Sequence, residues 1–309
     1  MAIIFRIIWF KKTYFQIQNL KLLIKLQKKT LKAKTSFNEL SAKEWVKNSS
    51  NVWNYSESST RNKYSKEHGA TFSISLAKKL ILIYSKKNDF IFDPFLGIGT
   101  TIVAANDLQR QSYGIELSEN YYNQSMEYVH NQKKLGEKYN FKIINDDCRN
   151  MLKHIPKEKI QFTLTSPPYA NFIQKSLKDR KTVHKKSLIR DSNNSTVKQY
   201  SNSPKDFGNL DYNVFKKEIK QVLKLNYEIT APNGYSAWIV KDYRDTKNNI
   251  PYIPFHSDIA EIGEEVGWKF HDLIILNQND KRRLIALGYP SVFYTNQNCS
   301  FVVIFRKPN

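Results

Sequence analysis

A stiff turn of polar and cyclic residues is the part of the sequence best suited to chemistry. Thr165-Ser-Pro-Pro-Tyr169 follows an apolar run, residues 160–164, that is typical of a buried strand. The two prolines fix φ and remove two N–H donors, so this backbone presents carbonyl oxygens. Ser166 Oγ and the Pro167 carbonyl are suited to accept hydrogens from an amino group, and Tyr169 offers a flat face for stacking a nucleobase. The alternative interpretation is a proline-rich turn or a short polyproline ligand.

A glycine-containing turn lies upstream, within Asp93-Pro-Phe-Leu-Gly-Ile-Gly-Thr-Thr101. Residues 90–93 predict a short buried strand and residues 100–108 the start of a helix. Gly97 and Gly99 therefore fall in a strand-to-helix turn, where a missing Cβ lets a ligand approach the backbone. Ile102 stands where the dinucleotide fingerprint needs a third glycine, and no Gly-Lys-Ser/Thr follows. Both departures disfavour a nicotinamide, flavin or P-loop site.

Two further predicted strands end in carboxylates. Residues 112–116 place Glu116 where nucleotide-binding sheets carry an acid for ribose hydroxyls, and residues 141–144 run into Asn145-Asp-Asp-Cys-Arg149. Taken alone, an acid after a strand is more often a helix cap or a solvated turn. The serial order of the glycine turn, Glu116, Asp147 and the Ser-Pro-Pro-Tyr string favours a ligand site at the carboxyl edge of a parallel sheet.

These strings resemble the motifs of the DNA amino-methyltransferases, whose first motif reads Asp-Pro-Phe-x-Gly-x-Gly-Thr-Thr. The resemblance implies the cofactor S-adenosyl-L-methionine (AdoMet), with Glu116 on its ribose, Asp147 accepting from its adenine amino group and the Cys148 backbone facing the ring. It also implies methyl transfer to an exocyclic amine of a base rotated out of the duplex. Ser at position 166 is typical of cytosine-N4 enzymes, whereas Asp or Asn is typical of adenine-N6 enzymes.

The residues assigned in this way form two sets. The expected catalytic residues are Ser166, Pro167, Pro168 and Tyr169. The expected cofactor-binding residues are Phe72, Asp93, Pro94, Phe95, Gly97, Gly99, Thr100, Thr101, Glu116, Asp147, Cys148 and Thr165.

Alternating strand and helix patterns predict a doubly wound, Rossmann-like α/β fold with a mostly parallel seven-stranded sheet, completed by a late antiparallel strand. The resemblance covers residues 52–307. Residues 53–55 and 68–72 look like the segment that lines the methionine end of AdoMet, although Gly69 and Ser73 stand where prolines are usual. A long helix is expected after 206–212, and the last three strands within 234–242, 267–275 and 300–307. The order of the cofactor half before the catalytic half fits a circularly permuted class of the family.

Composition agrees with a nucleic-acid partner. The chain of 309 residues has 49 Lys and Arg against 28 Asp and Glu, a net charge of +21. Such a field attracts polyanions, although a basic total is also a solubility trait or an echo of coding bias. Two cysteines and six scattered histidines show no metal-ligand spacing, so we expect no metal and a reducing, bacterial or archaeal cytoplasm.

Basic segments mark the expected domain boundaries. Residues 1–50 are expected to form a basic N-terminal extension and residues 51–309 the methyltransferase catalytic domain. The first apolar stretch, interrupted by Arg6, is far below the ~20 residues that span a bilayer, so no membrane attachment is expected. The basic stretch before Glu39 predicts either a helix packed on the domain, a surface for DNA or membrane, or a misassigned start.

A long polar insertion, residues 171–209, follows the Ser-Pro-Pro-Tyr turn. It carries nine Lys and Arg against three Asp, a net charge of +6, and is expected either to contact DNA or to be a solvated loop. Further base-edge donors are expected in the loops around 243–254 and 277–294. The candidate DNA-binding residues are Lys185, Lys186, Arg190, Lys281, Arg282 and Arg283.

The resulting hypothesis is a site-specific methyltransferase that acts on cytosine N4 of double-stranded DNA, within a restriction–modification system that has a separate cognate endonuclease. Adenine N6 is the nearest alternative. RNA or protein methylation is a second, although such enzymes usually carry Asn or Asp at the position of Ser166. A non-catalytic DNA-binding protein that retains the fold is a third, and AdoMet binding would distinguish it from the others.

Overall fold

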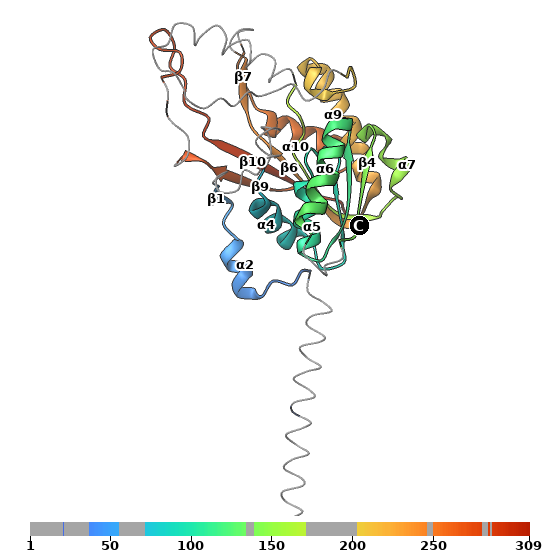
Figure 1. Cartoon of the computed structure of the whole chain (residues 1–309). Helices are drawn as coiled ribbons and strands as arrows, with labels where there is room; N and C mark the ends of the chain where they lie inside the picture. Colours follow the sequence, from blue (N-terminus) through green and yellow to red (C-terminus); the bar gives the residue numbers. More distant parts are fainter. Residues whose placement is uncertain are drawn as a thin grey trace, which may run out of the picture.

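A central eight-stranded sheet organises the protein in a computed structural model of the chain (Figure 1). The structure describes residues 21, 37–55, 72–133, 139–170, 203–245, 250–279, 284 and 286–309. The strand order is β1-β9-β10-β6-β5-β2-β3-β4. These strands are β1 (Val52–Asn54), β2 (Phe90–Asp93), β3 (Gln111–Glu116), β4 (Phe141–Asn145), β5 (Ile160–Thr165), β6 (Thr230–Val240), β9 (Lys269–Asn277) and β10 (Cys299–Arg306).

The chain reverses its direction of travel across the sheet between β2 and β5. From β2 it proceeds to β3 and β4 on one side, and then returns to β5 and β6 on the other, all in parallel pairs. Only β10 runs against its neighbours, pairing antiparallel with both β6 and β9. In open α/β sheets, ligands bind beyond the carboxyl ends of the strands at such a reversal. The carboxyl ends of β2 and β5 are Asp93 and Thr165, which begin the two sequence motifs.

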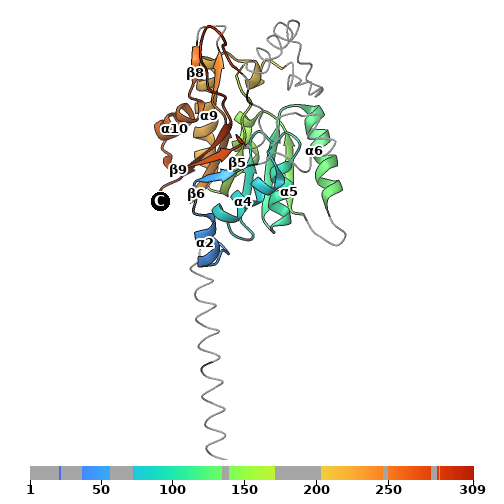
Figure 2. The same ribbon diagram turned by 90° about the vertical axis from the view of Figure 1, so that its left-hand side faces the viewer.

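Helices cover both faces of the sheet, with α4, α5 and α6 on one side and α9 and α10 on the other (Figure 2). The alternation of strand residues explains this layering, since neighbours such as Ile91 and Phe92 point to opposite faces and join different hydrophobic clusters. The helices are α2 (Ala42–Asn48), α4 (Ile74–Tyr84), α5 (Thr100–Asp107), α6 (Glu119–Gln132), α7 (Met151–His154), α9 (Tyr212–Ile229) and α10 (Phe255–Glu265), with short 3-10 turns η1 (Cys148–Asn150) and η2 (Phe207–Asn209).

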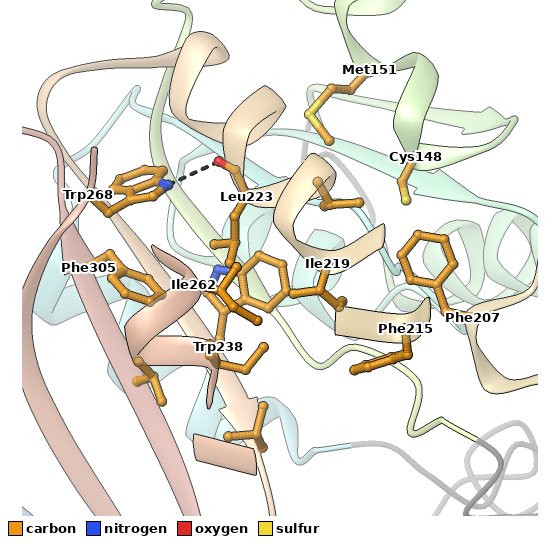
Figure 3. Close-up of a cluster of buried hydrophobic side chains, with 14 of the residues drawn as sticks. Cys148, Met151, Phe207, Phe215, Ile219, Leu223, Trp238, Ile262, Trp268 and Phe305 are labelled. Carbon is orange, nitrogen blue, oxygen red and sulfur yellow. Dashed lines mark hydrogen bonds between the residues drawn. The ribbon is translucent and has the colours of Figure 1, made fainter. Parts of the chain in front are cut away.

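The larger core lies between the sheet and helices α9 and α10 (Figure 3). Apolar residues recur at helical spacing along α9, where Ile219 and Leu223 are fully buried. The indole of Trp268 donates a hydrogen bond to the carbonyl of Leu223 at 3.0 Å, so this large side chain is buried with its polar group satisfied. Phe207 and Cys148 lie at the end of the same cluster, which connects the core to the ligand-binding edge.

The seven predicted strands are all present, and the mostly parallel sheet with its late antiparallel strand is confirmed. The sheet has an eighth member, β1, that the sequence analysis did not identify as a strand. This three-residue strand pairs parallel with β9 in the register Trp53 with Leu276. A separate two-stranded ribbon, β7 (Tyr243–Asp245) with β8 (Ile250–Ile253), follows β6 and was also not predicted as strand.

Residues 37–50 contact the body of the domain. The carboxylate of Glu39 bonds the guanidinium of Arg110 at 2.7 Å, and the Arg110 side chain is only 1% exposed. Asn38 donates to the carbonyl of Ile83 at 2.7 Å. Within the described part of the chain, no helix is both long and apolar enough to cross a membrane.

Candidate active site

The glycine turn between β2 and α5 is built by backbone conformations that favour glycine. Gly97 and Gly99 have φ values of 57° and 90°. A Cβ on Gly99 would lie 3.0 Å from a Val129 methyl on α6, so this glycine permits helix packing on the side away from the ligand. Gly97 lines a cavity at the sheet edge, together with Thr100 at the start of α5. The turn therefore brings backbone close to a ligand at Gly97, while Gly99 serves the packing of α6.

Glu116 lies at the end of β3 and faces this cavity. Its carboxylate accepts hydrogen bonds from the N–H groups of Gly97 and Ser118, each at 2.8 Å. Burial raises the pKa of Glu116 to about 7, against these hydrogen bonds, and the charges of Asp93 and Asp206 raise it further. The carboxylate is thus fixed by two donors and retains lone pairs for hydroxyl donors of a ligand.

Asp147 follows β4 and is held from behind by Arg149. The Nε atom of Arg149 lies 2.9 Å from Asp147 Oδ1, and its Nη1 atom bonds Glu218 of α9 at 2.6 Å. The same guanidinium donates to the carbonyl of Lys205 at 3.3 Å and lies 5.0 Å from the centroid of the Phe207 ring. Arg149 therefore joins two lining segments of the cavity, Asp147 and residues 205–207, to helix α9 behind them. Because each Asp147 oxygen already accepts from Arg149, an adenine amino group would share this carboxylate.

The Ser-Pro-Pro-Tyr turn leaves β5 beside the glycine turn. Ser166 Oγ donates to the carbonyl of Ile239 on β6 at 3.0 Å. Tyr169 packs edge-on against Phe255 and Tyr243, with ring centroids 5.6 Å and 6.1 Å away. Residues of β6, β7 and α10 thus fix the serine and the tyrosine at the rim of the cavity.

The cavity brings together most of the residues assigned from the sequence. Of these it is lined by Phe72, Pro94, Phe95, Gly97, Thr100, Glu116, Asp147, Cys148, Ser166, Pro167, Pro168 and Tyr169. The glycine turn, the two carboxylates and the catalytic turn, which are far apart in the sequence, therefore surround one space.

Four residues that we assigned to the cofactor do not line the cavity: Asp93, Gly99, Thr101 and Thr165. Asp93 is 1% exposed and accepts hydrogen bonds from Thr101 Oγ1 and Thr165 Oγ1, both at 2.6 Å. Burial raises the pKa of Asp93 to about 6. Asp93, Thr101 and Thr165 join β2, α5 and β5 behind the cavity wall, whereas Gly99 packs against α6. Their direct contact with a cofactor stays a prediction.

Sequence reasoning missed several lining residues. Besides the assigned residues, the cavity is lined by Leu96, Ile115, Leu117, Ser118, Tyr121, Lys205, Asp206 and Phe207. Leu117 and Ser118 could have been found, since they directly follow the strand-end acid. Phe207 could not, because it lies at the end of the long insertion and reaches the cavity through tertiary packing, such as its contact with Phe95 at 5.5 Å between ring centroids.

The candidate DNA-binding residues Lys185, Lys186, Arg190, Lys281, Arg282 and Arg283 lie outside the described residues. Where the structure is described, no group of three His, Cys, Asp or Glu side chains could hold a metal ion.

The similarity to known proteins includes the glycine-turn motif of the candidate site. Residues 6–127 match the family model described as DNA methylase, a span that includes the glycine turn and Glu116 but ends before the Ser-Pro-Pro-Tyr turn. The type II methyltransferase M.MthZI of Methanothermobacter thermautotrophicus is 36% identical over 81 residues, which cover 26% of this chain and 23% of that protein. These findings support the DNA amino-methyltransferase family.

One further curated relative agrees with this family. The orphan methyltransferase M.BamHII of Bacillus amyloliquefaciens is 39% identical over 74 residues, covering 23% of this chain and 28% of that protein. The matched segments span about a quarter of the length of these curated relatives. Among solved structures, a SAM-dependent methyltransferase from Aquifex aeolicus is 13% identical, with a TM-score of 0.42 over 74% of this chain and 88% of that chain.

The residues of the cavity fit AdoMet, the methyl donor of the amino-methyltransferase family. Its acidic and basic lining residues are Glu116, Asp147 and Asp206 with Lys205, so acids predominate in a protein whose net charge is +21. An acidic pocket suits a ligand that carries a sulfonium and an ammonium group. Glu116 offers acceptors for a ribose, and Phe207 with other apolar side chains offers walls for a purine.

Proposed function

We propose that this protein transfers a methyl group from AdoMet to the N4 amine of cytosine in duplex DNA. The observation that carries the proposal is the orientation of the Ser166 hydroxyl beside the cofactor cavity. Its proton is directed to the Ile239 carbonyl at 3.0 Å, so the lone pairs of Ser166 Oγ are left as acceptors. An exocyclic amine has two hydrogens to donate and needs acceptors of this kind.

The catalytic turn orients the amine. Hydrogen bonds from the amine to Ser166 Oγ and to the Pro167 carbonyl direct its lone pair away from the ring plane. Tyr169 stacks with the base that is rotated out of the duplex, and stacking of this kind contributes ~1–3 kcal/mol per base. AdoMet, when bound, supplies an electrophilic methyl group. Most of the rate then comes from alignment in a desolvated cavity.

The environment of Cys148 supports a direct transfer without a covalent enzyme intermediate. This cysteine lines the cavity, but burial raises the pKa of its thiol far above the ordinary value, and Asp147 raises it further. A thiol that resists ionisation is a poor nucleophile for cytosine C6. Methylation at cytosine C5, which needs such an attack, is therefore not the proposed reaction.

Nucleoside analysis tests the target atom. After incubation with labelled AdoMet, the DNA is digested and its nucleosides are analysed by mass spectrometry. We expect N4-methylcytosine. Detection of N6-methyladenine would refute cytosine N4 as the target atom and support adenine N6. Label in RNA or protein, with unlabelled DNA, would refute DNA as the substrate.

The basic insertion is the segment that we propose contacts the DNA backbone. Residues 171–209 carry a net charge of +6 directly after the catalytic turn. If Lys185, Lys186 and Arg190 contact phosphates, their replacement by Gln should weaken binding at every sequence and lower the salt slope by about three. AdoMet affinity should stay unchanged. An unchanged salt slope would indicate that the insertion is a solvated loop whose basic residues do not contact DNA phosphates.

The biological setting follows from the relatives. M.MthZI is named a type II methyltransferase. We propose that this chain is likewise the modification enzyme of a restriction–modification system with a separately acting endonuclease, working in a bacterial or archaeal cytoplasm. Sequencing of DNA from cells that express it would give the recognition site from the positions of the modified base.

A further inference from the structure

A second cavity borders the active site on the other side of Tyr169. Tyr169 lines both cavities, and the second is formed by Lys241–Arg244 and by the connection between β9 and β10, including Gly288, Val292 and Tyr294. The strands β6 and β9 both run antiparallel to β10, so they are parallel to each other and their carboxyl ends meet at one sheet edge. The connection therefore stands at the carboxyl edge of the sheet, where Ser166 follows the parallel strand β5. Figure 1 shows its dark red part extending beyond β9 and β10.

Backbone hydrogen bonds define a turn within this connection, Gly288–Tyr294. The N–H groups of Ser291 and Val292 donate to the Gly288 carbonyl at 2.9 and 2.8 Å, and the Tyr294 N–H donates to the Leu287 carbonyl at 3.3 Å. Gly288 has φ of +75°, and a Cβ there would lie 2.2 Å from the Val292 oxygen. Only glycine fits this position, so the turn has one well-determined shape.

Arg244 fastens the turn to strand β7. Its Nη1 donates to the Thr295 carbonyl at 3.0 Å, and its Nη2 to Thr295 Oγ1 at 3.4 Å. The guanidinium also lies 5.2 Å from the centroid of the Tyr294 ring. The turn is therefore held in place by side chains that line the second cavity.

This fixed turn presents large aromatic side chains to water. Phe293 is 89% exposed and Tyr289 82% exposed, and Val292 beside them is 50% exposed. Such a cluster on a defined turn marks an interaction site, because apolar surface of this size is otherwise costly to leave in water.

The charge nearby favours duplex DNA as the partner that covers Phe293 and Tyr289. Lys241 and Arg244 line the adjoining cavity, and the sequence places Lys281-Arg-Arg283 shortly before the turn. Apposing two copies of this surface would bring like charges together in a chain of net charge +21, whereas DNA phosphates attract them.

We propose that the Gly288–Tyr294 turn is a wedge that enters the duplex beside the target base. Phe293 fills the space that the rotated base leaves, and Tyr289 contacts the flanking base pair. Proteins that deform DNA insert apolar side chains between bases in this way. The inference rests on the proposed function, since it needs a base that leaves the stack.

The test compares Phe293→Ala with the wild-type protein on two duplexes. Both carry the site found methylated in cells expressing the wild-type chain, with the target cytosine replaced by 2-aminopurine, which pairs with thymine. One duplex is fully paired and the other has a mismatch at the target pair, which lowers the cost of rotating the base. On paired DNA we expect Phe293→Ala to bind about 10- to 100-fold more weakly, with a reduced fluorescence increase. On the mismatched duplex, Phe293→Ala should recover most of its binding affinity and most of its fluorescence increase. Phe293→Trp should behave as wild type on both duplexes.

The controls separate a wedge from other roles. Val46→Ala removes a 74% exposed apolar side chain on α2, away from the site, and should change neither signal. AdoMet affinity of Phe293→Ala should equal that of the wild type. An equal loss on both duplexes would refute the wedge, as would dissociation of a dimer by Phe293→Ala in sedimentation. Absence of methyl transfer by the wild type would instead refute the proposed function itself.

Discussion

The carboxylate of Glu116 should make the free protein less stable as the pH rises toward neutrality. Burial raises its pKa from 4.5 to about 7 in the folded protein. The folded state therefore holds this proton more tightly than the unfolded chain does. The contribution of this proton to the free energy of unfolding is fully present below pH 4.5 and is lost as the pH rises through about 7. Glu116→Gln removes the ionisation and with it this dependence on pH.

The size of the effect follows from the two pKa values. The full difference corresponds to about 3 kcal/mol, of which about 2.5 kcal/mol falls between pH 5 and pH 8. Glutamine also replaces one of the two oxygens that accept from Gly97 and Ser118 by a donor. That loss costs about 1–3 kcal/mol at every pH. The change in the free-energy difference between variant and wild type from pH 5 to pH 8 therefore isolates the ionisation.

Urea unfolding of the cofactor-free protein at pH 5 and pH 8 measures this change. The emission of Trp238 and Trp268 can report unfolding, because both are buried. The free energy of unfolding of Glu116→Gln, taken relative to that of the wild type, should be about 2.5 kcal/mol higher at pH 8 than at pH 5. Glu119→Gln, an exposed change three residues along the chain, is the matched control and should show no such gain. An equal free-energy difference at both pH values would refute the reasoning.

The same ionisation should control cofactor affinity. A carboxylate accepts two ribose hydroxyls better than a carboxylic acid, so wild-type AdoMet affinity should increase as the pH rises through about 7. Calorimetric titration would measure it, and Glu116→Gln should bind weakly at both pH values. The residue thus lowers the stability of the free protein at neutral pH in order to serve the ligand.

Ser166→Ala should lower the rate constant of methyl transfer, measured in single-turnover assays, about 100-fold with little change in AdoMet affinity. An unchanged rate constant would exclude Ser166 from orienting the amine. Gly99→Val should cost about 2–4 kcal/mol in urea unfolding, because a β-branched residue tolerates neither the left-handed φ nor the contact with α6, and wild-type stability would contradict this. Deletion of residues 1–50 should cost about 2 kcal/mol relative to deletion of residues 1–36, because the buried guanidinium of Arg110 loses its carboxylate partner. Equal melting of the two truncated proteins would instead support the predicted domain boundary at residue 50.

Local patterns were sufficient to predict the seven main strands. Most contain an apolar run bounded by turn residues, and in a sheet covered on both faces such runs need no tertiary information to be identified. The more polar β3 (Gln111–Glu116) was identified by its place in the order of motifs and by the acid that ends it. The strand β1 lacked that signal. It has three residues, of which only Trp53 is buried, and it exists because β9, more than 200 residues later, offers an unpaired edge.

The site could be predicted where a motif is contiguous. The glycine turn and the Ser-Pro-Pro-Tyr turn each place several lining residues within one short string. Asp206 and Phe207 reach the same cavity from the end of the insertion, and their position depends on the bonds of Arg149 to Asp147 and to the Lys205 carbonyl. Such a contact is set by tertiary packing, which leaves no periodic trace in the sequence.

The two motifs are joined by Asp93, which explains why a motif residue need not touch the ligand. Asp93 ends β2, and one of its oxygens accepts from Thr101 of the glycine turn while the other accepts from Thr165 at the start of the catalytic turn. The strands β2 and β5 are neighbours because the chain reverses its path between them. A single buried carboxylate therefore fixes the distance between the cofactor end and the target end of the cavity. In the proposed methyl transfer, which depends on alignment of two bound groups, that fixed distance would serve the reaction as directly as a contact.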